Sequence, residues 1–228
     1  MKLNEGKLIV ICGTDGSGKG TQTKLLKKRL KEEGYDIETI DFPQYGKKSA
    51  GLVENYLNGE YGDSEEIGPY RASIFFACDR YDASFQIREW LNKGKIVICN
   101  RYVSANMGHQ AGKIRDEEKR DKFLDWLHDL EYNIFKIPKP DVNILLYMPH
   151  EYGHKLVEKK ESRKYLEGKK RDIHENDLKH LKHAERSYLY VSKKFNWEKI
   201  DCVEDEKILS IRKISDKVVK KVKEIINE

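Results

Sequence analysis

The sequence lacks any apolar run approaching the ~18–20 residues that a membrane-spanning helix requires. Its first six residues lead directly into a short apolar run, without the longer apolar region of a secretory signal peptide. Internal repeats and long linkers are also missing, so we expect the 228 residues to form one domain, residues 1–228. These absences exclude a membrane-spanning protein and predict a cytoplasmic one with no membrane partner.

The sequence also has few cysteines, and they form no metal-binding or disulfide pattern. Cys12, Cys78, Cys99 and Cys202 lie far apart and include no CxxC pair. Three of them sit in apolar runs, where cysteine usually packs as a small hydrophobic side chain. We therefore expect buried, unpaired thiols.

Charge of one sign is not strongly in excess, since the net charge is +5. A mild positive charge fits an anionic substrate and also weak, non-specific nucleic-acid binding. No nucleic-acid-binding motif accompanies it, so no nucleic-acid partner is expected. The charge is uneven, however, because residues 159–171 hold seven basic side chains and two acidic ones.

What the sequence does contain is an alternation of β-branched apolar runs with long helical patterns. We expect strands over residues 7–12, 35–42, 95–99, 142–148 and 198–203. Helices are expected over residues 18–33, 49–57, 68–92, 116–135, 151–161, 175–195 and the Lys-rich C-terminal segment. This order predicts an α/β fold of three layers, with a five-stranded parallel sheet and helices on both of its faces.

Residues 13–19, GTDGSGK, have the GxxxxGK spacing of a phosphate-binding P-loop between a predicted strand and a predicted helix. Glycine at three positions lets consecutive backbone N–H groups turn toward phosphate oxygens. The helix N-terminus and the Lys19 ammonium add positive charge. We expect the phosphates of ATP to bind at Gly13, Thr14, Asp15, Gly16, Ser17, Gly18, Lys19, Gly20 and Thr21.

One position departs from the usual P-loop motif. Gly20 follows the lysine where a Ser or Thr normally contacts Mg²⁺, and Thr21 comes one position later. The run GKGTQ is similar to the corresponding run of adenylate kinases. Because Mg²⁺ can stay largely hydrated and lean on substrate phosphates, the change weakens one protein contact without excluding the metal.

Beyond the loop, four further segments form a recognisable set: FPQYG at residues 42–46, VENYLNGEYG at 53–62, an F-x-x-D-R pattern at 76–80, and NRY at 100–102. Together with the P-loop they resemble the thymidylate kinase family over nearly the whole chain. The resemblance implies a P-loop kinase fold with a basic lid and a homodimer. It also implies that ATP phosphorylates a nucleoside monophosphate, with dTMP as the leading acceptor and dTDP as its product.

The resemblance also implies individual roles on the acceptor side. Asp15 would hydrogen-bond the 3′-hydroxyl of the acceptor, and Arg101 would contact its phosphate. Phe76 would stack on the base, while Arg80 and Asn106 would contact polar groups of the base. Phe42, Tyr45 and His109 complete the expected acceptor site.

The basic stretch resembles the family's lid, which we place at about residues 159–172. Arginine forks suit phosphate oxygens, and a closing basic loop neutralises charge in the transition state. The expected catalytic residues are therefore Lys19, Arg101, Arg163 and Arg171. Asp172 and Glu175 match acids that the family uses near the acceptor sugar and the hinge of the lid.

Three positions break the family pattern. Asn100 stands where the family has an aspartate that helps to hold Mg²⁺ through water, which leaves Thr21 and Asn100 as weak metal contacts. His109 stands where the family has Tyr or Phe beside the sugar, a position that helps to exclude a 2′-hydroxyl. Gln44 replaces an arginine and removes one positive charge.

These departures leave two alternatives open. His109 permits a related kinase with another acceptor, such as dUMP, a ribonucleotide or a nucleoside. Asn100 and Gly20 permit a nucleotide-binding regulator that has lost catalysis. Lys19, Arg101 and the basic stretch favour an enzyme, because a sensor needs no cluster of charges aimed at a transition state.

Overall fold

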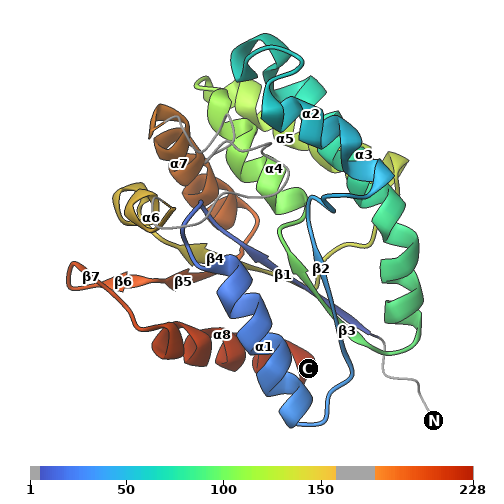
Figure 1. Cartoon of the computed structure of the whole chain (residues 1–228), viewed down its shortest axis with the longest axis vertical. Coiled ribbons are helices and arrows are strands. Elements are labelled where there is room, and N and C mark those ends of the chain that lie inside the picture. Colours follow the sequence, from blue (N-terminus) through green and yellow to red (C-terminus); the bar gives the residue numbers. More distant parts are fainter. Residues whose placement is uncertain (1–5, 158–177, 228) are drawn as a thin grey trace.

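A five-stranded, wholly parallel sheet forms the centre of the computed structural model, which describes residues 6–157 and 178–227 (Figure 1). The strand order is β2-β3-β1-β4-β5. The strands are β1 (Lys7–Cys12), β2 (Ile37–Asp41), β3 (Ile96–Asn100), β4 (Val142–Tyr147) and β5 (Glu198–Asp201). The prediction of a five-stranded parallel sheet is confirmed.

Eight α-helices within the described residues connect and flank these strands. They are α1 (Lys19–Glu32), α2 (Gly51–Asn58), α3 (Ser64–Asn92), α4 (Val103–His109), α5 (Glu117–His128), α6 (His150–Val157), α7 (Leu178–Lys194) and α8 (Ile211–Ile226). A small antiparallel hairpin, β6 (Val203–Glu204) and β7 (Lys207–Ile208), follows β5. Within the described ranges, no helix combines the length and apolar character needed to cross a bilayer.

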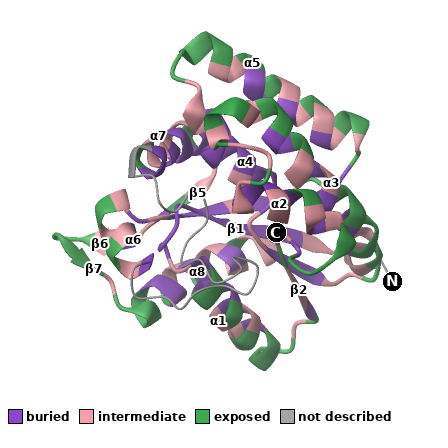
Figure 2. Ribbon diagram, turned by 45° about the horizontal axis from the view of Figure 1, so that its top comes forward, coloured by how far each residue is buried: buried purple, intermediate pink, exposed green. Residues whose placement is uncertain are grey.

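Both faces of the sheet are covered, which explains why its strands read as continuous apolar runs. Ile9 and Ile11 of β1 pack with α1 and α8, on the lower side of the sheet in Figure 1. Leu8, Val10 and Cys12 point the other way and pack with α3, α4, α5 and α7. The alternating side chains of one strand therefore serve two cores, and Figure 2 shows the sheet as mostly buried between them.

The four cysteines are free thiols, and Cys12, Cys99 and Cys202 are buried. Burial raises the pKa of the Cys12 thiol to about 12. A thiol that stays protonated is a poor nucleophile and a poor metal ligand. The expectation of buried, unpaired thiols is confirmed for these three.

Two predicted helix boundaries differ from the structure for local reasons. α3 begins at Ser64, capped by Asp63 and Glu66, and it bends at Gly68, where the φ angle is 71°. The predicted helix over residues 116–135 is α5 followed by a π-helical turn, Asp129–Ile134. α4 and the β6–β7 hairpin were not predicted, because elements this short carry no readable periodicity.

Candidate active site

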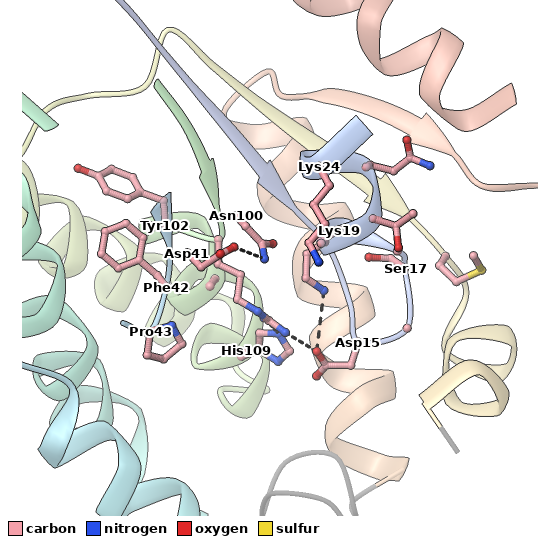
Figure 3. Close-up of a pocket in the computed structure, with 18 of the residues that line it drawn as sticks. Asp15, Ser17, Lys19, Lys24, Asp41, Phe42, Pro43, Asn100, Tyr102 and His109 are labelled. Atoms are coloured by element: carbon pink, nitrogen blue, oxygen red, sulfur yellow. Dashed lines mark hydrogen bonds and ion pairs between the residues drawn. The ribbon is translucent and has the colours of Figure 1, made fainter. Parts of the chain in front are cut away.

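A cavity of about 870 Å³ opens at the carboxyl ends of β1, β2 and β3, where open α/β sheets bind ligands (Figure 3). One side is the loop between β1 and α1, and the other is formed by α3, α4 and the segment after β2. The predicted site residues that line it are Asp15, Gly16, Ser17, Gly18, Lys19, Gly20, Thr21, Phe42, Tyr45, Phe76, Arg80, Asn100, Arg101, Asn106 and His109. One space therefore brings together the predicted phosphate-binding and acceptor-binding groups.

The P-loop is fixed by backbone contacts that only glycine allows. Gly16 has a φ angle of 80°, and a Cβ atom there would lie 2.1 Å from the carbonyl oxygen of Gly153 in α6. A Cβ atom on Gly153 would in turn lie 2.4 Å from the carbonyl oxygen of Asp15. A side chain therefore has no room at residue 16.

Hydrogen bonds hold the side chains of the loop in place, and the Ser17 hydroxyl is left as a donor for a ligand. Lys19 Nζ donates to the Thr14 carbonyl over 2.7 Å and lies 3.8 Å from Asp15 Oδ1. Thr14 Oγ1 donates to the Met148 carbonyl over 3.0 Å. Ser17 Oγ is buried and has no hydrogen-bond partner among the described residues. A buried hydroxyl of this kind suits an oxygen atom of a bound ligand.

Arg101 occupies a strained backbone position at the end of β3. Its φ angle is 66°, which costs a residue other than glycine about 1 kcal/mol. Its backbone N–H donates to the Ile11 carbonyl over 2.9 Å, so β1 holds the turn. The guanidinium pairs with the Asp15 carboxylate and lies 3.0 Å from His109 Nε2. Strain of this type is concentrated at functional sites, because the surrounding structure has to maintain it.

His109 continues this network into α7. Its Nδ1 atom lies 3.3 Å from Nε2 of His180, and the two rings are stacked at 5.5 Å. Burial lowers the pKa of His109 well below its ordinary value, and Arg101 acts in the same direction, so the ring is neutral at pH 7. Because Arg101 can only donate, Nε2 accepts and the proton is assigned to Nδ1. His180 was missed in the sequence, since a lone histidine in a helix carries no signal.

The opposite wall of the cavity is aromatic and amide-bearing. Phe76 is half-buried and meets Tyr56 edge to face, with ring centroids 6.1 Å apart. Asn106 is buried and donates to the Ser73 carbonyl over 3.2 Å. Phe42 is buried and Tyr45 is exposed at the same wall. This mixture suits a flat, partly polar ring system.

Arg80 is completely buried and is anchored by a residue that the sequence did not reveal. Its Nε atom lies 3.0 and 3.1 Å from the two carboxylate oxygens of Glu131, and Nη2 also donates to that carboxylate. Glu131 belongs to the π-helical turn after α5 and is fully buried. A guanidinium held in this way can offer its remaining amino group, Nη1, to the cavity.

Gln44, another of the three departures from the family pattern, is part of a buried hydrogen-bond cluster. Its backbone N–H donates to Asp79 Oδ2 over 2.9 Å, and its Nε2 donates to Oδ1 over 3.2 Å. Ser49 Oγ donates to the same carboxylate over 2.7 Å. Gln44 therefore fixes the segment after β2 against α3.

The end of β3 carries a pair of side chains that the sequence does not predict. Asn100 Nδ2 donates to Asp41 Oδ1 over 2.8 Å, and both residues line the cavity (Figure 3). Asn100 Oδ1 is buried without a hydrogen-bond partner in the described part of the chain. Thr21 is exposed at the start of α1. An acid directly before the FPQYG segment was the available sequence signal for Asp41.

The remaining predicted site residues lie outside the described residues: Arg163, Arg171, Asp172 and Glu175, with the lid at residues 159–172. Among the described residues, no group of three or more His, Cys, Asp or Glu side chains is arranged to hold a metal ion.

A glycine-rich phosphate loop between β1 and α1, joined by one cavity to an aromatic wall, defines a P-loop kinase that serves a small acceptor. A family model described as thymidylate kinase matches residues 11–206. This chain belongs to the thymidylate kinase family, and it is an enzyme of the kinase class.

Individual relatives agree with this assignment. Thymidylate kinase of Mycobacterium tuberculosis is 31% identical over 171 residues, which cover 75% of this chain and 78% of that one. A probable thymidylate kinase of Pyrococcus abyssi is 34% identical over 145 residues, or 63% and 66% of the two chains. The solved structure of thymidylate kinase from Candida albicans superimposes with a TM-score of 0.73 at 20% identity, covering 97% of this chain and 94% of that one. At that identity the match supports the fold alone.

Proposed function

We propose that this chain transfers the γ-phosphoryl group of ATP to dTMP and releases ADP and dTDP. The observation that carries the proposal is the continuous cavity, which runs from the P-loop past Arg101 to Phe76 and Asn106. Donor and acceptor phosphates that enter from its two ends meet beside Lys19 and Arg101. Positioning two substrates and neutralising charge is most of what phosphoryl transfer needs from a protein.

On the donor side, Gly13 to Thr21 hold the phosphates of ATP. The Ser17 hydroxyl is an unused donor within the loop, and Lys19 lies along the inner edge of the loop. When ATP binds, Lys19 exchanges its contact with the Thr14 carbonyl for phosphate oxygens. Because the charge is already placed, little reorganisation remains for the transition state.

On the acceptor side, Phe76 stacks on the thymine ring, and Asn106 and the remaining amino group of Arg80 contact its polar edge. Asp15 accepts a hydrogen bond from the 3′-hydroxyl, and Arg101 binds the acceptor phosphate. Phe42, Tyr45 and His109 complete the pocket. The support for these roles is that all of these side chains line the same cavity.

Arg163 and Arg171 are proposed to reach the transferring phosphoryl group from the lid, where their planar forks neutralise charge on its oxygens. Asp172 and Glu175 are proposed to act near the acceptor sugar and the hinge of the lid. The basic surplus over residues 159–171 supports these assignments.

Mg²⁺ is proposed as the cofactor, and the residues present fit it. Asn100 Oδ1 is a buried acceptor without a partner among the described residues, and it suits a proton of a metal-bound water. Thr21 also lines the cavity. When bound, Mg²⁺ neutralises charge on the phosphates of ATP.

A cytoplasmic homodimer is proposed for the assembly. Four large apolar side chains of α3 are exposed: Tyr70, Ile74, Tyr81 and Phe85. An apolar surface of this kind is fit to be covered by a second copy of the chain. Sedimentation equilibrium should give the mass of two chains, and a monomer at micromolar concentration would refute the dimer.

The direct test of the activity is to incubate the protein with ATP, Mg²⁺ and dTMP and to separate the nucleotides by chromatography. We expect dTDP and ADP in equal amounts, and almost none of either from Lys19→Ala. Formation of ADP without dTDP would indicate another acceptor. A parent protein that binds ATP but releases no ADP with any acceptor would be a regulator.

A further inference from the structure

We propose that Asp41, at the end of β2, supplies the carboxylate that positions hydrated Mg²⁺ beside the phosphates of ATP. In this view the acid that the family carries at the end of β3 has moved to the neighbouring strand. The inference rests on the proposed function, since it assumes a complex of Mg²⁺ and nucleotide in the cavity. It names Asp41 as a positioning residue that acts through metal-bound water.

The two positions are equivalent in the sheet. Asp41 and Asn100 are register partners in the parallel pairing of β2 with β3, and neighbouring strands lie about 4.8 Å apart. Their side chains point toward each other and are joined by the 2.8 Å hydrogen bond from Nδ2 to Oδ1 (Figure 3). The Asp41 carboxylate is therefore one strand away from Asn100, the neutral residue that stands where the family has an acid.

Among the acids that line the cavity, Asp41 is also the one whose charge is still available to a metal-bound water. The cavity wall contains three carboxylates, on Asp15, Asp41 and Asp79. Asp15 is paired with Arg101 and Lys19. Asp79 accepts hydrogen bonds from Gln44 and Ser49. Asp41 is exposed and accepts from a neutral amide, and no ion pair within the described ranges includes it.

Asn100 complements this carboxylate. Because a carboxylate only accepts hydrogen bonds, Asp41 fixes the amide of Asn100 with nitrogen toward the acid and oxygen away from it. The oxygen remains a buried acceptor without a partner in the described part of the chain. The amide also lies against the P-loop, since a Cβ atom on Gly20 would be 3.9 Å from Asn100 Nδ2. One charged acceptor and one neutral acceptor beside the P-loop suit the waters that Mg²⁺ retains.

Mn²⁺ is the probe for the test, because free Mn²⁺ can be counted by electron paramagnetic resonance. The dissociation constant of Mn²⁺ is measured on the complex of protein and saturating ADP, in the parent and in Asp41→Asn. We expect about tenfold weaker binding in the variant, the loss that follows removal of an outer-shell partner of a metal. The fold should survive, because an amide at residue 41 can still accept the hydrogen bond from Asn100.

A swapped variant, Asp41→Asn with Asn100→Asp, returns the acid to β3 and keeps one hydrogen bond between the strands. It should restore the dissociation constant to within about threefold of the parent. Glu38→Gln is the matched control: it removes the same charge from the same strand, but its partner is Lys95 at 2.8 Å. We expect no change in Mn²⁺ affinity from this control.

An unchanged Mn²⁺ affinity in Asp41→Asn overturns the inference, because the residue would then only join two strands. Equal weakening in Asp41→Asn and Glu38→Gln also overturns it, since the effect would then come from overall charge. A parent protein that shows the expected Mn²⁺ results but does not phosphorylate dTMP refutes the proposed acceptor and leaves the role of Asp41 intact. Turnover of dTMP is therefore assayed separately on the parent.

Discussion

Two arginine–carboxylate pairs occupy different regions of this molecule and show how one interaction can serve two purposes. Arg80 and Glu131 are 2% and 0% exposed and join α3 to the π-helical turn after α5. Arg101 and Asp15 are 19% and 7% exposed and lie at the mouth of the P-loop. Arg80 lines the cavity, but its contact with Glu131 is sealed in the protein, whereas the contact between Arg101 and Asp15 opens onto the cavity.

The surroundings of each pair explain the difference. Glu131 offers both oxygens to Arg80, so neither charge is left without a partner in the core. Asp15 is shared between Arg101 and Lys19, and Arg101 is also close to His109. A shared pair can exchange partners when a phosphate or a hydroxyl arrives, whereas a sealed pair cannot do so without unfolding its shell.

The largest effect should come from breaking the sealed pair. Glu131→Ala leaves the Arg80 charge buried without its partner, which should lower the free energy of unfolding by about 3–5 kcal/mol. Urea denaturation followed by circular dichroism measures it. Glu117→Ala is the control, because Glu117 is 73% exposed and only approaches Arg120 at 3.9 Å. A loss below about 1 kcal/mol would mean that the buried pair is not essential to the fold.

Removing the Lys19 charge, which lies beside the open pair, should lower the rate of catalysis and leave stability nearly unchanged. Lys19→Ala should lower kcat by about 10²–10³, because one preplaced charge at the transferring phosphoryl group is lost. The melting temperature should stay within a few degrees of the parent. Lys28→Ala, an exposed substitution on the same helix, is the control for turnover. A Lys19 variant within about threefold of the parent would remove the P-loop from the mechanism.

The two arginines can be compared directly by the same substitution. Arg101→Lys keeps the charge but loses the planar fork, and kcat/KM for dTMP should fall by about 10- to 100-fold. Arg80→Lys should also lower kcat/KM, because the base contact is lost, but unlike Arg101→Lys it should lower stability as well, because Glu131 loses one of its two charge-assisted contacts. Parallel melting curves and initial rates distinguish the two outcomes. If both variants lose activity and neither loses stability, the division between a sealed and an open pair is wrong.

The smallest effect concerns pH and His109. The pKa of this ring is lowered in the folded protein, so below pH ~6.5 the unfolded chain takes up a proton that the native ring resists. Stability should therefore decrease as the pH falls below ~6.5, by at most about 1.4 kcal/mol per pH unit from this group. His109→Phe should give a shallower dependence between pH 6.5 and 5 in urea titrations. An identical slope in the variant would show that burial of the ring does not control its protonation.

The sequence predicts those parts of the fold that depend on residues close together in the chain. β1 and the P-loop are contiguous, and glycine is required by the backbone contact at Gly16 and by the positive φ angles of Gly16 and Gly18, so a short window contains the information. The spacing of apolar residues likewise distinguishes strands from helices, and the alternation of the two predicts the parallel sheet. The family resemblance then locates the acceptor side through Phe76 and Arg101.

The contacts that the sequence could not predict join residues far apart in the chain. Glu131 lies 51 positions from Arg80, His180 lies 71 from His109, and Asp41 lies 59 from Asn100. No local pattern distinguishes an acid that will neutralise a buried arginine from one on a solvated helix. The π-helical turn that directs Glu131 inward is also invisible in the sequence, because a single turn with i→i+5 hydrogen bonds is too short to carry a readable period of its own.

Acceptor selectivity tests most directly whether the open pair and the wall around Phe76 form a thymidylate site. With ATP and Mg²⁺, kcat/KM is measured for dTMP, dUMP, dAMP, dCMP, CMP and thymidine. We expect the highest value for dTMP, because a stacking phenylalanine, an asparagine and an arginine meet the base while Arg101 requires its phosphate. A value for dAMP, CMP or thymidine that exceeds that of dTMP by about tenfold would contradict it.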